Sequence, residues 1–498
     1  MRGASWILIV TLALSNLLGV IRDHFLAQKI PTDQLDIYYA AFRLPDLLFN
    51  VLILGATSAA VIPILSRTFK EGSAKAWRLV NNLLCTGLGI LILALVVLYF
   101  LLPYILPWIV PDFPINKLET TIGLARWMLL SPLFFAISYI WGSILNSKKR
   151  FLSYALAPLF YNFSIILFTV FGVNAWGVAA PVIGVIAGAL LHMLSQLPAV
   201  LSLGFRPKII VDIKDKNILR IFRLMVPRAI ALGASQIQLL AFTAFASAIP
   251  GAIAIYSLTD NIQTVPTVIF GISLATAVFP SLANLGDVQN KKKFVNLVTK
   301  VAKAVLFLLI PAAVGMLLLR AQIVRLILGY GYFGWADTKM ASDTLALFAV
   351  GIVAQGLIPL LARAYYAIEN TRFPMKSAVV SVAVGVVVGY FALQKLGVSG
   401  LGLAFALAGW TQLFILLWGL EAQISFRLTW AFWKEIAQMI FLSLTMALLM
   451  QLVKMSFARY FDIDYVVILL TQTILAAGAG ILWYLGVAWL LKMPQIRR

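Results

Sequence analysis

Charged and amide side chains inside apolar stretches are the residues of this sequence that could do chemistry. The first such stretch contains Asn16, Arg22 and Asp23, and the second contains Arg43 and Asp46. An ionised side chain within hydrocarbon costs about 2.5–3.5 kcal/mol, so each of them needs a partner or a function. Arginine suits a diphosphate because its planar guanidinium donates paired, charge-assisted hydrogen bonds. Arg22 and Arg43 are therefore candidates for binding an anionic head group in a cavity.

Structural explanations compete with this one. Arg43 and Asp46 are three residues apart on one helix face and could simply pair with each other. Arg22 and Asp23 could equally anchor a helix end at the membrane interface. Asp260 could begin a helix that lines a cavity, or it could be a plain N-cap. The sequence leaves both kinds of explanation open.

Asp36 and Asn162 join the polar groups of the first half of the chain as candidate binding residues. Ser235, Gln236 and Gln238 form a polar patch in the seventh apolar segment, for which hydrogen bonds between helices are the favoured interpretation.

Several classes of enzyme are disfavoured by what the chain contains. It has no G-x-x-x-x-G-K-[ST] loop for nucleotide phosphates. A single cysteine, Cys85, and two histidines, His24 and His192, are too few for a zinc site or a Ser–His–Asp triad. We therefore predict a carrier with no catalytic residues, metal or cofactor.

Composition sets the class of fold. Of 498 residues 62% are hydrophobic and only 11% are charged, so lipid must cover much of the apolar surface. A helix that crosses the bilayer needs about 20 mostly apolar residues, which predicts an all-α integral membrane protein of about fourteen transmembrane helices. The segments are 4–21, 37–66, 79–102, 122–146, 154–172, 177–203, 224–248, 256–283, 301–319, 342–367, 376–393, 397–420, 434–455 and 465–491.

The net charge of +21 fits membrane topology better than nucleic-acid binding. Connections on the side of the termini carry about 25 Lys and Arg residues and the opposite loops about nine, which predicts cytoplasmic termini. The Ala4–Val20 run is expected to stay as the first helix, because Arg22-Asp23-His24 follows it in place of a cleavage site.

Two segments share a plan that indicates a repeat. RLPDLLFNVLILGATSAAVIPILS and NIQTVPTVIFGISLATAVFPSLAN each place a Gly-containing apolar run between prolines, and both segments are expected to be bent or broken. We predict two pseudo-symmetric six-helix lobes, 1–203 and 224–420, as in many secondary transporters. A basic cytoplasmic linker, 204–223, would join them, and helices 13 and 14 would occupy 421–498.

The stretch SNLLGVIRDHFLAQKIPTDQLDIYYAAFRLPDLLFNVLILGATSAAVIPILS resembles the amino-terminal signature of the MurJ/MviN family of lipid II flippases, within the multidrug/oligosaccharidyl-lipid/polysaccharide exporter superfamily. Further similarity lies in GSILNSKKRFLSYALAPLFYN, SQLP, SQIQ, FPSLA and RAYYAIENTRFPMK. The family residues kept in the first stretch are Ser15, Gly19, Arg22, Asp23, Asp36, Ala41, Phe42, Pro45, Gly55, Ala56 and Pro63.

The resemblance implies transport of a lipid-linked peptidoglycan precursor by alternating access, in the bacterial inner membrane. Its tails would lie in a groove at helices 13 and 14, and cell-wall assembly proteins would be possible partners. The family usually has Arg where this chain has Asn16, Phe49 and Asn261; Arg126 and Arg228 are candidates to compensate. Three functions stay open as alternatives: a flippase for another polyprenyl-diphosphate glycolipid, a cation-coupled small-molecule exporter, and a non-transporting scaffold.

Overall fold

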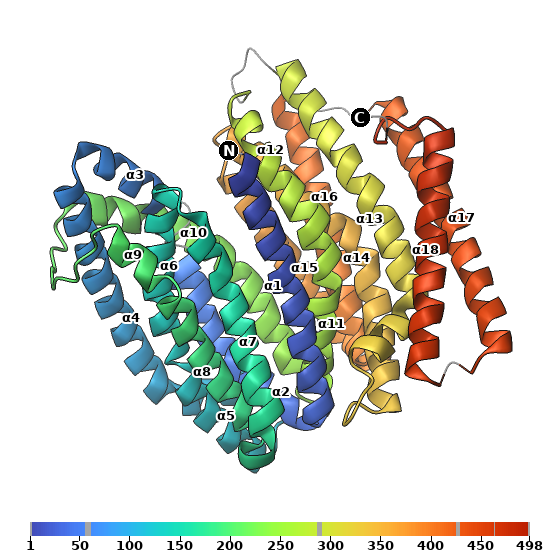
Figure 1. The fold of residues 1–498 in the computed structure, drawn as a ribbon, viewed down its shortest axis with the longest axis horizontal. Helices are drawn as coiled ribbons and strands as arrows, with labels where there is room; N and C mark the ends of the chain where they lie inside the picture. The colour runs from blue at the N-terminus through green and yellow to red at the C-terminus, as the bar shows by residue number, and fades with distance from the viewer. Residues whose placement is uncertain (1, 55–60, 286–290, 425–428, 463, 497–498) are drawn as a thin grey trace. The chain divides into compact units, whose positions relative to one another are not determined.

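The computed structural model describes residues 2–54, 61–285, 291–424, 429–462 and 464–496, and within these ranges every regular element is a helix (Figure 1). The predicted all-α class is confirmed. The elements up to residue 246 are α1 (Arg2–Lys29), α2 (Thr32–Leu48), η1 (Phe49–Leu54), α3 (Ile62–Glu71), α4 (Ser73–Ile109), α5 (Ile115–Met128), α6 (Ser131–Ser147), α7 (Phe151–Trp176), α8 (Ala179–Leu194), α9 (Leu197–Ser202) and α10 (Lys216–Ala246). They are followed by α11 (Ala252–Pro266), η3 (Thr267–Ile272), α12 (Ser273–Ala283), α13 (Lys291–Ile327), α14 (Trp335–Ala367), α15 (Arg372–Leu396), α16 (Val398–Ile424), α17 (Trp430–Tyr460) and α18 (Val466–Leu490).

Eleven spans in the described part of the chain are long and apolar enough to cross a membrane. They coincide with eleven of the fourteen predicted segments. The remaining three segments coincide with α1, with α2 and η1, and with α10. Over its described residues, each segment expected from hydropathy is therefore largely helical, and the chain is a multi-pass membrane protein.

The two segments predicted to be bent are interrupted at corresponding places. η1 and η3 are six-residue π-helical turns, one beginning four residues after Pro45 and the other directly after Pro266. Proline lacks the N–H that would continue the α-helical ladder, and π-turns occur where that ladder is disturbed. Gly55 and Ala56, which follow η1, lie outside the described residues.

Element lengths repeat along the chain as well. α4 and α13 each have 37 residues. The α5–α6 span and α14, which come next in each half, each cover 33 residues. The order and length of the helices thus confirm the predicted pseudo-symmetric halves, which α17 and α18 follow.

The chain divides into two compact units, Met1–Ala254 and Ile255–Arg498. In the first unit, α10 packs against η1, α4 and α2. α10 is the first helix of the second repeat, so this unit contains more than the first repeat. A buried cluster that includes Leu65, Trp141 and Ile221 joins α3, α6 and α10.

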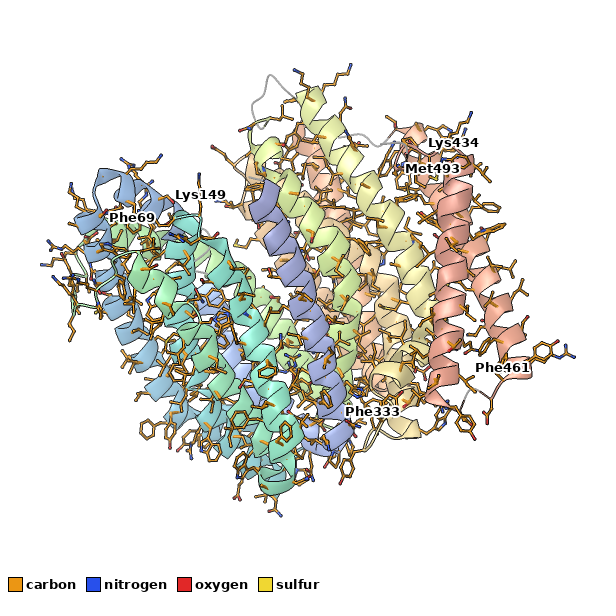
Figure 2. All side chains as sticks on the ribbon, in the orientation of Figure 1. Phe69, Lys149, Phe333, Lys434, Phe461 and Met493 are labelled. Carbon is orange, nitrogen blue, oxygen red and sulfur yellow. The ribbon has the colours of Figure 1, made fainter. Side chains whose placement is uncertain are left out.

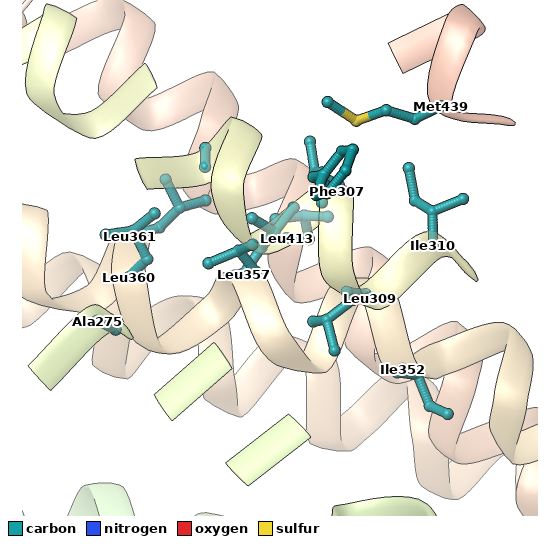
Figure 3. Packing of buried hydrophobic residues seen from close by; sticks show 14 of the residues in the cluster. Ala275, Phe307, Leu309, Ile310, Ile352, Leu357, Leu360, Leu361, Leu413 and Met439 are labelled. Carbon is teal, nitrogen blue, oxygen red and sulfur yellow. The ribbon is translucent and has the colours of Figure 1, made fainter. Parts of the chain in front are cut away.

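The second unit has its apolar core along α13 and α14 (Figure 3). Met439 of α17 packs into the same cluster, and the Tyr484 hydroxyl of α18 donates a 2.9 Å hydrogen bond to the Phe307 carbonyl of α13. The last two helices are therefore fixed to α13. In this unit Lys434 and Met493 lie at one end and Phe333 and Phe461 at the other, as expected of helices that alternate in direction (Figure 2).

Candidate functional site

Arg22 is the centre of a polar cluster between α1 and α7. Its Nε and Nη2 atoms donate to Asp23 Oδ1 at 2.9 and 2.8 Å, and Nη1 donates to Asn162 Oδ1 at 3.2 Å. The Arg22 side chain is 19% exposed, whereas that of Asp23 is 1% exposed. The predicted residues Arg22, Asp23 and Asn162 are thus brought together, with the guanidinium as the member that a ligand can reach.

Asn162 connects this cluster to both helices. Its amide nitrogen donates to the carbonyl of Ser15 at 3.3 Å and to that of Pro158, one turn earlier on α7, also at 3.3 Å. Asn16, the next predicted residue, lies half-buried on α1 beside Ser15. A single amide side chain therefore fixes both the helix pair and the arginine.

Arg43 and Asp46 form hydrogen bonds to α10. The Nε atom of Arg43 donates to Thr243 Oγ1 at 2.8 Å, and Gln236 Nε2 donates to Asp46 Oδ2 at 3.4 Å. The bond of Gln236 confirms the prediction of hydrogen bonding between helices for that residue alone, because Ser235 bonds within its own helix and the buried Nε2 of Gln238 has no hydrogen-bond partner in the described part of the chain. Arg43 is buried, so it contributes to the junction of α2 with α10.

Asp36 is occupied by the protein's own donors. Its Oδ2 accepts from the Gly251 backbone N–H at 2.7 Å and from Lys117 Nζ at 3.1 Å, and its Oδ1 accepts from the Ala254 N–H at 2.9 Å. The carboxylate is fully buried and caps the first turn of α11 from another helix. This geometry favours an anchoring role over the predicted contact with a ligand.

Asp260 lies in the second unit, in the third turn of α11. Both interpretations that placed it at a helix start were wrong, because α11 begins at Ala252. Its Oδ1 accepts a 2.8 Å hydrogen bond from Gln263, one turn later.

Phe49 and Asn261 stand where the resemblance implies arginines. The Phe49 ring packs against those of Phe135 and Tyr139, with centroids 5.0 and 5.3 Å apart, so this part of η1 has an aromatic environment. Asn261 is half-buried on α11. Of the two residues proposed to compensate, Arg126 lies over the Tyr99 ring at 4.7 Å, and the side chain of Arg228 is outside the described residues.

Two groups of polar residues were not predicted from the sequence. Lys117 of α5 lies 2.5 Å from Asp33 as well as close to Asp36, both on α2, and only the packing of these two helices brings the residues together. His192 is buried with Nδ1 2.6 Å from Ser138 Oγ, and Gln196 donates a 2.5 Å hydrogen bond to the same hydroxyl. The spacing of His192 and Gln196, one helical turn apart, was the available signal.

The first unit also contains a cavity of about 240 Å³ between η1, α4, α6 and α10. All of its lining residues are apolar or glycine, among them Val51, Leu83, Ile140 and Met225. It offers no hydrogen bond to a head group, and neither Arg22 nor Arg43 is part of its wall.

Pseudo-symmetric helical halves with interrupted second segments, a terminal helix pair and charged groups held between helices define a multi-pass membrane transporter. The family model described as lipid II flippase MurJ matches residues 32–472, and the chain belongs to this family. A probable lipid II flippase MurJ of Rhizobium meliloti is 30% identical over 81% of this chain and 77% of its own length. Another, from Rickettsia prowazekii, is 25% identical over 96% of both chains.

Solved structures show the same fold. A lipid II flippase MurJ in an inward closed conformation superimposes with a TM-score of 0.82 at 23% identity, over 98% of this chain and 99% of that one. An inward-facing multidrug resistance transporter of the MATE family has a TM-score of 0.67 at 15% identity, over 84% of this chain and 96% of that one. Of these two, the lipid II flippase has the greater structural similarity and matches nearly the whole chain.

Proposed function

We propose that this protein is a flippase that moves lipid II, a lipid-linked peptidoglycan precursor, from the cytoplasmic to the outer leaflet by alternating access. Membership of the lipid II flippase family supports the substrate. The observation that carries the site is Arg22, a partly exposed guanidinium held in a fixed orientation between two membrane helices.

The hydrogen bonds of Arg22 leave room for a phosphate. A guanidinium has five N–H donors, and within the described part of the chain three of them bind Asp23 and Asn162. The remaining N–H groups, one on each terminal nitrogen, are available to oxygens of a diphosphate. Asp23 and Asn162 act as positioning residues, because they hold the guanidinium plane without contacting the substrate themselves.

The other predicted binding residues have different parts in the proposal. Arg43 would bind the head group only in a state where its bond to Thr243 opens, so it is proposed to act during the conformational change. Asn16 in the first unit and Asp260 in the second are each proposed to bind the substrate by hydrogen bonding, and Asp36 to anchor α11.

The membrane arrangement follows from the charge distribution. We propose a bacterial inner-membrane location with both termini in the cytoplasm and with residues 204–223 as a cytoplasmic linker between lobes 1–203 and 224–420. The lipid tails would occupy a groove at residues 421–498, where α17 and α18 expose large apolar side chains such as Phe441, Leu448 and Leu482. The proposed partners are the transported lipid, membrane lipids and cell-wall assembly proteins, and no catalytic step by the chain is proposed.

Complementation of a strain depleted of its own lipid II flippase tests the proposal. The wild-type chain is expected to restore growth and the appearance of lipid II at the outer surface. Arg22→Ala is expected to abolish both, and Arg22→Lys to restore them partly, because lysine keeps the charge without the fork. Arg67→Ala, which removes an exposed arginine of α3, is the matched control.

Membrane levels of each variant must be equal for this comparison. Full complementation by Arg22→Ala would refute the role of Arg22. Failure of the wild-type chain, together with export of another polyprenyl-linked glycolipid or of a drug, would reassign the substrate. Failure in every transport assay would leave the scaffold function.

A further inference from the structure

Residues 204–215, which connect α9 to α10, form an extended segment that runs alongside the first part of α4 (Figure 1). Phe205 fixes its beginning, since it is buried beside Trp77 with ring centroids 5.7 Å apart. Asp215 fixes its end, because it caps α10 through the N–H of Asn217 at 2.7 Å. The segment between these points has a defined position.

Two adjacent asparagines of α4 fix the middle of the segment. Asn81 donates to the Arg206 carbonyl at 3.0 Å and accepts from the Lys208 N–H at 2.9 Å. Asn82 binds both backbone groups of Asp212 in the same way, at 2.9 and 2.8 Å. Both asparagines are buried, so their amides serve the backbone of the segment and no solvent.

This attachment turns three large apolar side chains outward. Ile209, Val211 and Ile213 are 93%, 64% and 63% exposed, while Ile210 and Asp212 between them are less exposed. Such alternation is expected of an extended chain, in which successive side chains point to opposite sides, and it holds from residue 209 to the turn that begins at Ile213. The result is an apolar ridge, Ile209–Val211–Ile213, that the fold itself leaves uncovered.

The depth of the ridge follows from α4. The predicted apolar segment of that helix, 79–102, begins at Leu79, within one turn of Asn81 and Asn82. The two asparagines therefore lie where hydrocarbon gives way to head groups, and the segment bound to them lies at that level.

Cationic side chains flank the ridge. Lys208 precedes it, Lys214 and Lys216 follow it, and all three are exposed. Of the two carboxylates in the same stretch, Asp212 lies 3.8 Å from Arg78 of α4 and Asp215 caps α10. An apolar strip with lysines beside it is the composition of segments that lie in the interface of membranes with anionic lipids.

We propose that residues 208–216 form a membrane-docking surface whose partner is the anionic phospholipid of the adjacent leaflet. Ile209, Val211 and Ile213 insert among the upper parts of the acyl chains, and the three lysines bind lipid phosphates. The segment that joins the two repeats is thereby tied to the bilayer surface. This surface is independent of the transported substrate and of the proposed function.

Fluorescence of single-cysteine variants in the full-length protein tests the proposal. Cys85 is the sole cysteine, so a Cys85→Ala background can take Val211→Cys labelled with an environment-sensitive dye. The matched control is Ser73→Cys. Ser73 is an exposed residue of α4, about 12 Å along the helix before Asn81 at 1.5 Å per residue. The protein is reconstituted in nanodiscs of phosphatidylcholine with or without phosphatidylglycerol, each containing a lipid with a nitroxide high on its acyl chain.

Quenching by the nitroxide lipid is expected to be at least about three times stronger for the label at position 211 than for the label at position 73. Aqueous iodide should quench the label at position 211 only weakly. Phosphatidylglycerol should strengthen this effect, and Lys208→Gln/Lys214→Gln/Lys216→Gln should remove that strengthening. Equal quenching at both positions would overturn the insertion. An unchanged response in the lysine variant would overturn the anionic-lipid part. Protection from both quenchers would mean that protein covers the ridge, which also contradicts the proposal.

Discussion

Arg22 of α1 donates a 3.2 Å hydrogen bond to Asn162 of α7, across 140 residues of sequence. Asn162 in turn binds the Ser15 carbonyl of α1, so one amide positions the guanidinium and joins the two helices. The orientation of the proposed phosphate ligand is thus set by a residue that need not touch the substrate.

Asn162→Ala is therefore expected to reduce transport while the protein stays folded. A hydrogen bond to a charged group contributes about 1.5–3 kcal/mol, which corresponds to a loss of about tenfold or more in transport. The measurement is the rate at which lipid II reaches the outer leaflet of proteoliposomes. Asn116→Ala, at an exposed position of α5, is the control and should leave the rate unchanged. A wild-type rate for Asn162→Ala would exclude the positioning role.

The pair Arg22–Asp23 allows folding and function to be separated. Asp23→Leu alone should cost about 3–5 kcal/mol, because it leaves a largely buried guanidinium without its counter-ion. The double variant Arg22→Met/Asp23→Leu removes both charges and should recover most of the stability, yet it should not flip lipid II. Thermal unfolding in detergent and the complementation assay measure the two effects. Transport by the double variant would contradict the proposed role of the arginine.

Asp36 and Asp33 give a matched comparison around Lys117. Asp36→Ala removes the buried one of the two carboxylates that bind Lys117 and leaves two backbone N–H groups without their acceptor, with an expected loss of about 3–5 kcal/mol. Asp33 contacts the same lysine but is 58% exposed, so Asp33→Ala should cost less than about 1 kcal/mol. Unfolding by a denaturing detergent provides both values, and equal losses would argue against the anchoring of α11 by Asp36.

A close helix crossing in the second unit predicts the effect of one methyl group. A Cβ on Gly271 of η3 would lie 2.7 Å from the Cα of Gly356 on α14. This distance is too short for two carbon atoms, so one of the two backbones would have to shift. Gly271→Ala should destabilise the protein by about 1–3 kcal/mol. Gly478→Ala on α18, where a Cβ meets open space, should be neutral or slightly stabilising. Similar melting temperatures for the two variants would refute the close approach.

Local signals in the sequence were sufficient for the helices. Apolar runs of membrane length located all fourteen segments, and prolines such as Pro45 and Pro266 identified the two that contain π-turns. These properties depend on residues within a few turns of each other, so one sequence is enough to recognise them.

Partners between distant helices could not be predicted in this way. The predicted start of α11 was too late because the residue that caps this helix is Asp36, 215 residues before Gly251. No capping residue next to the start of the helix was available as a signal. The same holds for Asn162 and Arg22, whose pairing depends on how α1 packs against α7. Residue types thus indicated which side chains need partners, while packing decided which partners they have.

The terminal helix pair is held to the rest of the second unit by an ion pair that can be measured. Lys303 Nζ of α13 lies 2.6 Å from Glu435 Oε1 of α17, and both side chains are about four-fifths buried, at 19% and 21% exposure. Because partial burial weakens solvent screening, a double-mutant cycle with Lys303→Ala and Glu435→Ala should give a coupling free energy of about 1 kcal/mol. The exposed pair Arg67–Glu71, at 74% and 49% exposure, should give about 0.5 kcal/mol or less in the same experiment.

If α17 and α18 form the wall of the groove for lipid tails, loosening the contact of Lys303 with Glu435 should also slow flipping in both single variants. Slowed flipping without measurable coupling would assign the effect to another contact of these residues, and unchanged flipping with strong coupling would mean that the attachment of the pair to α13 serves stability alone.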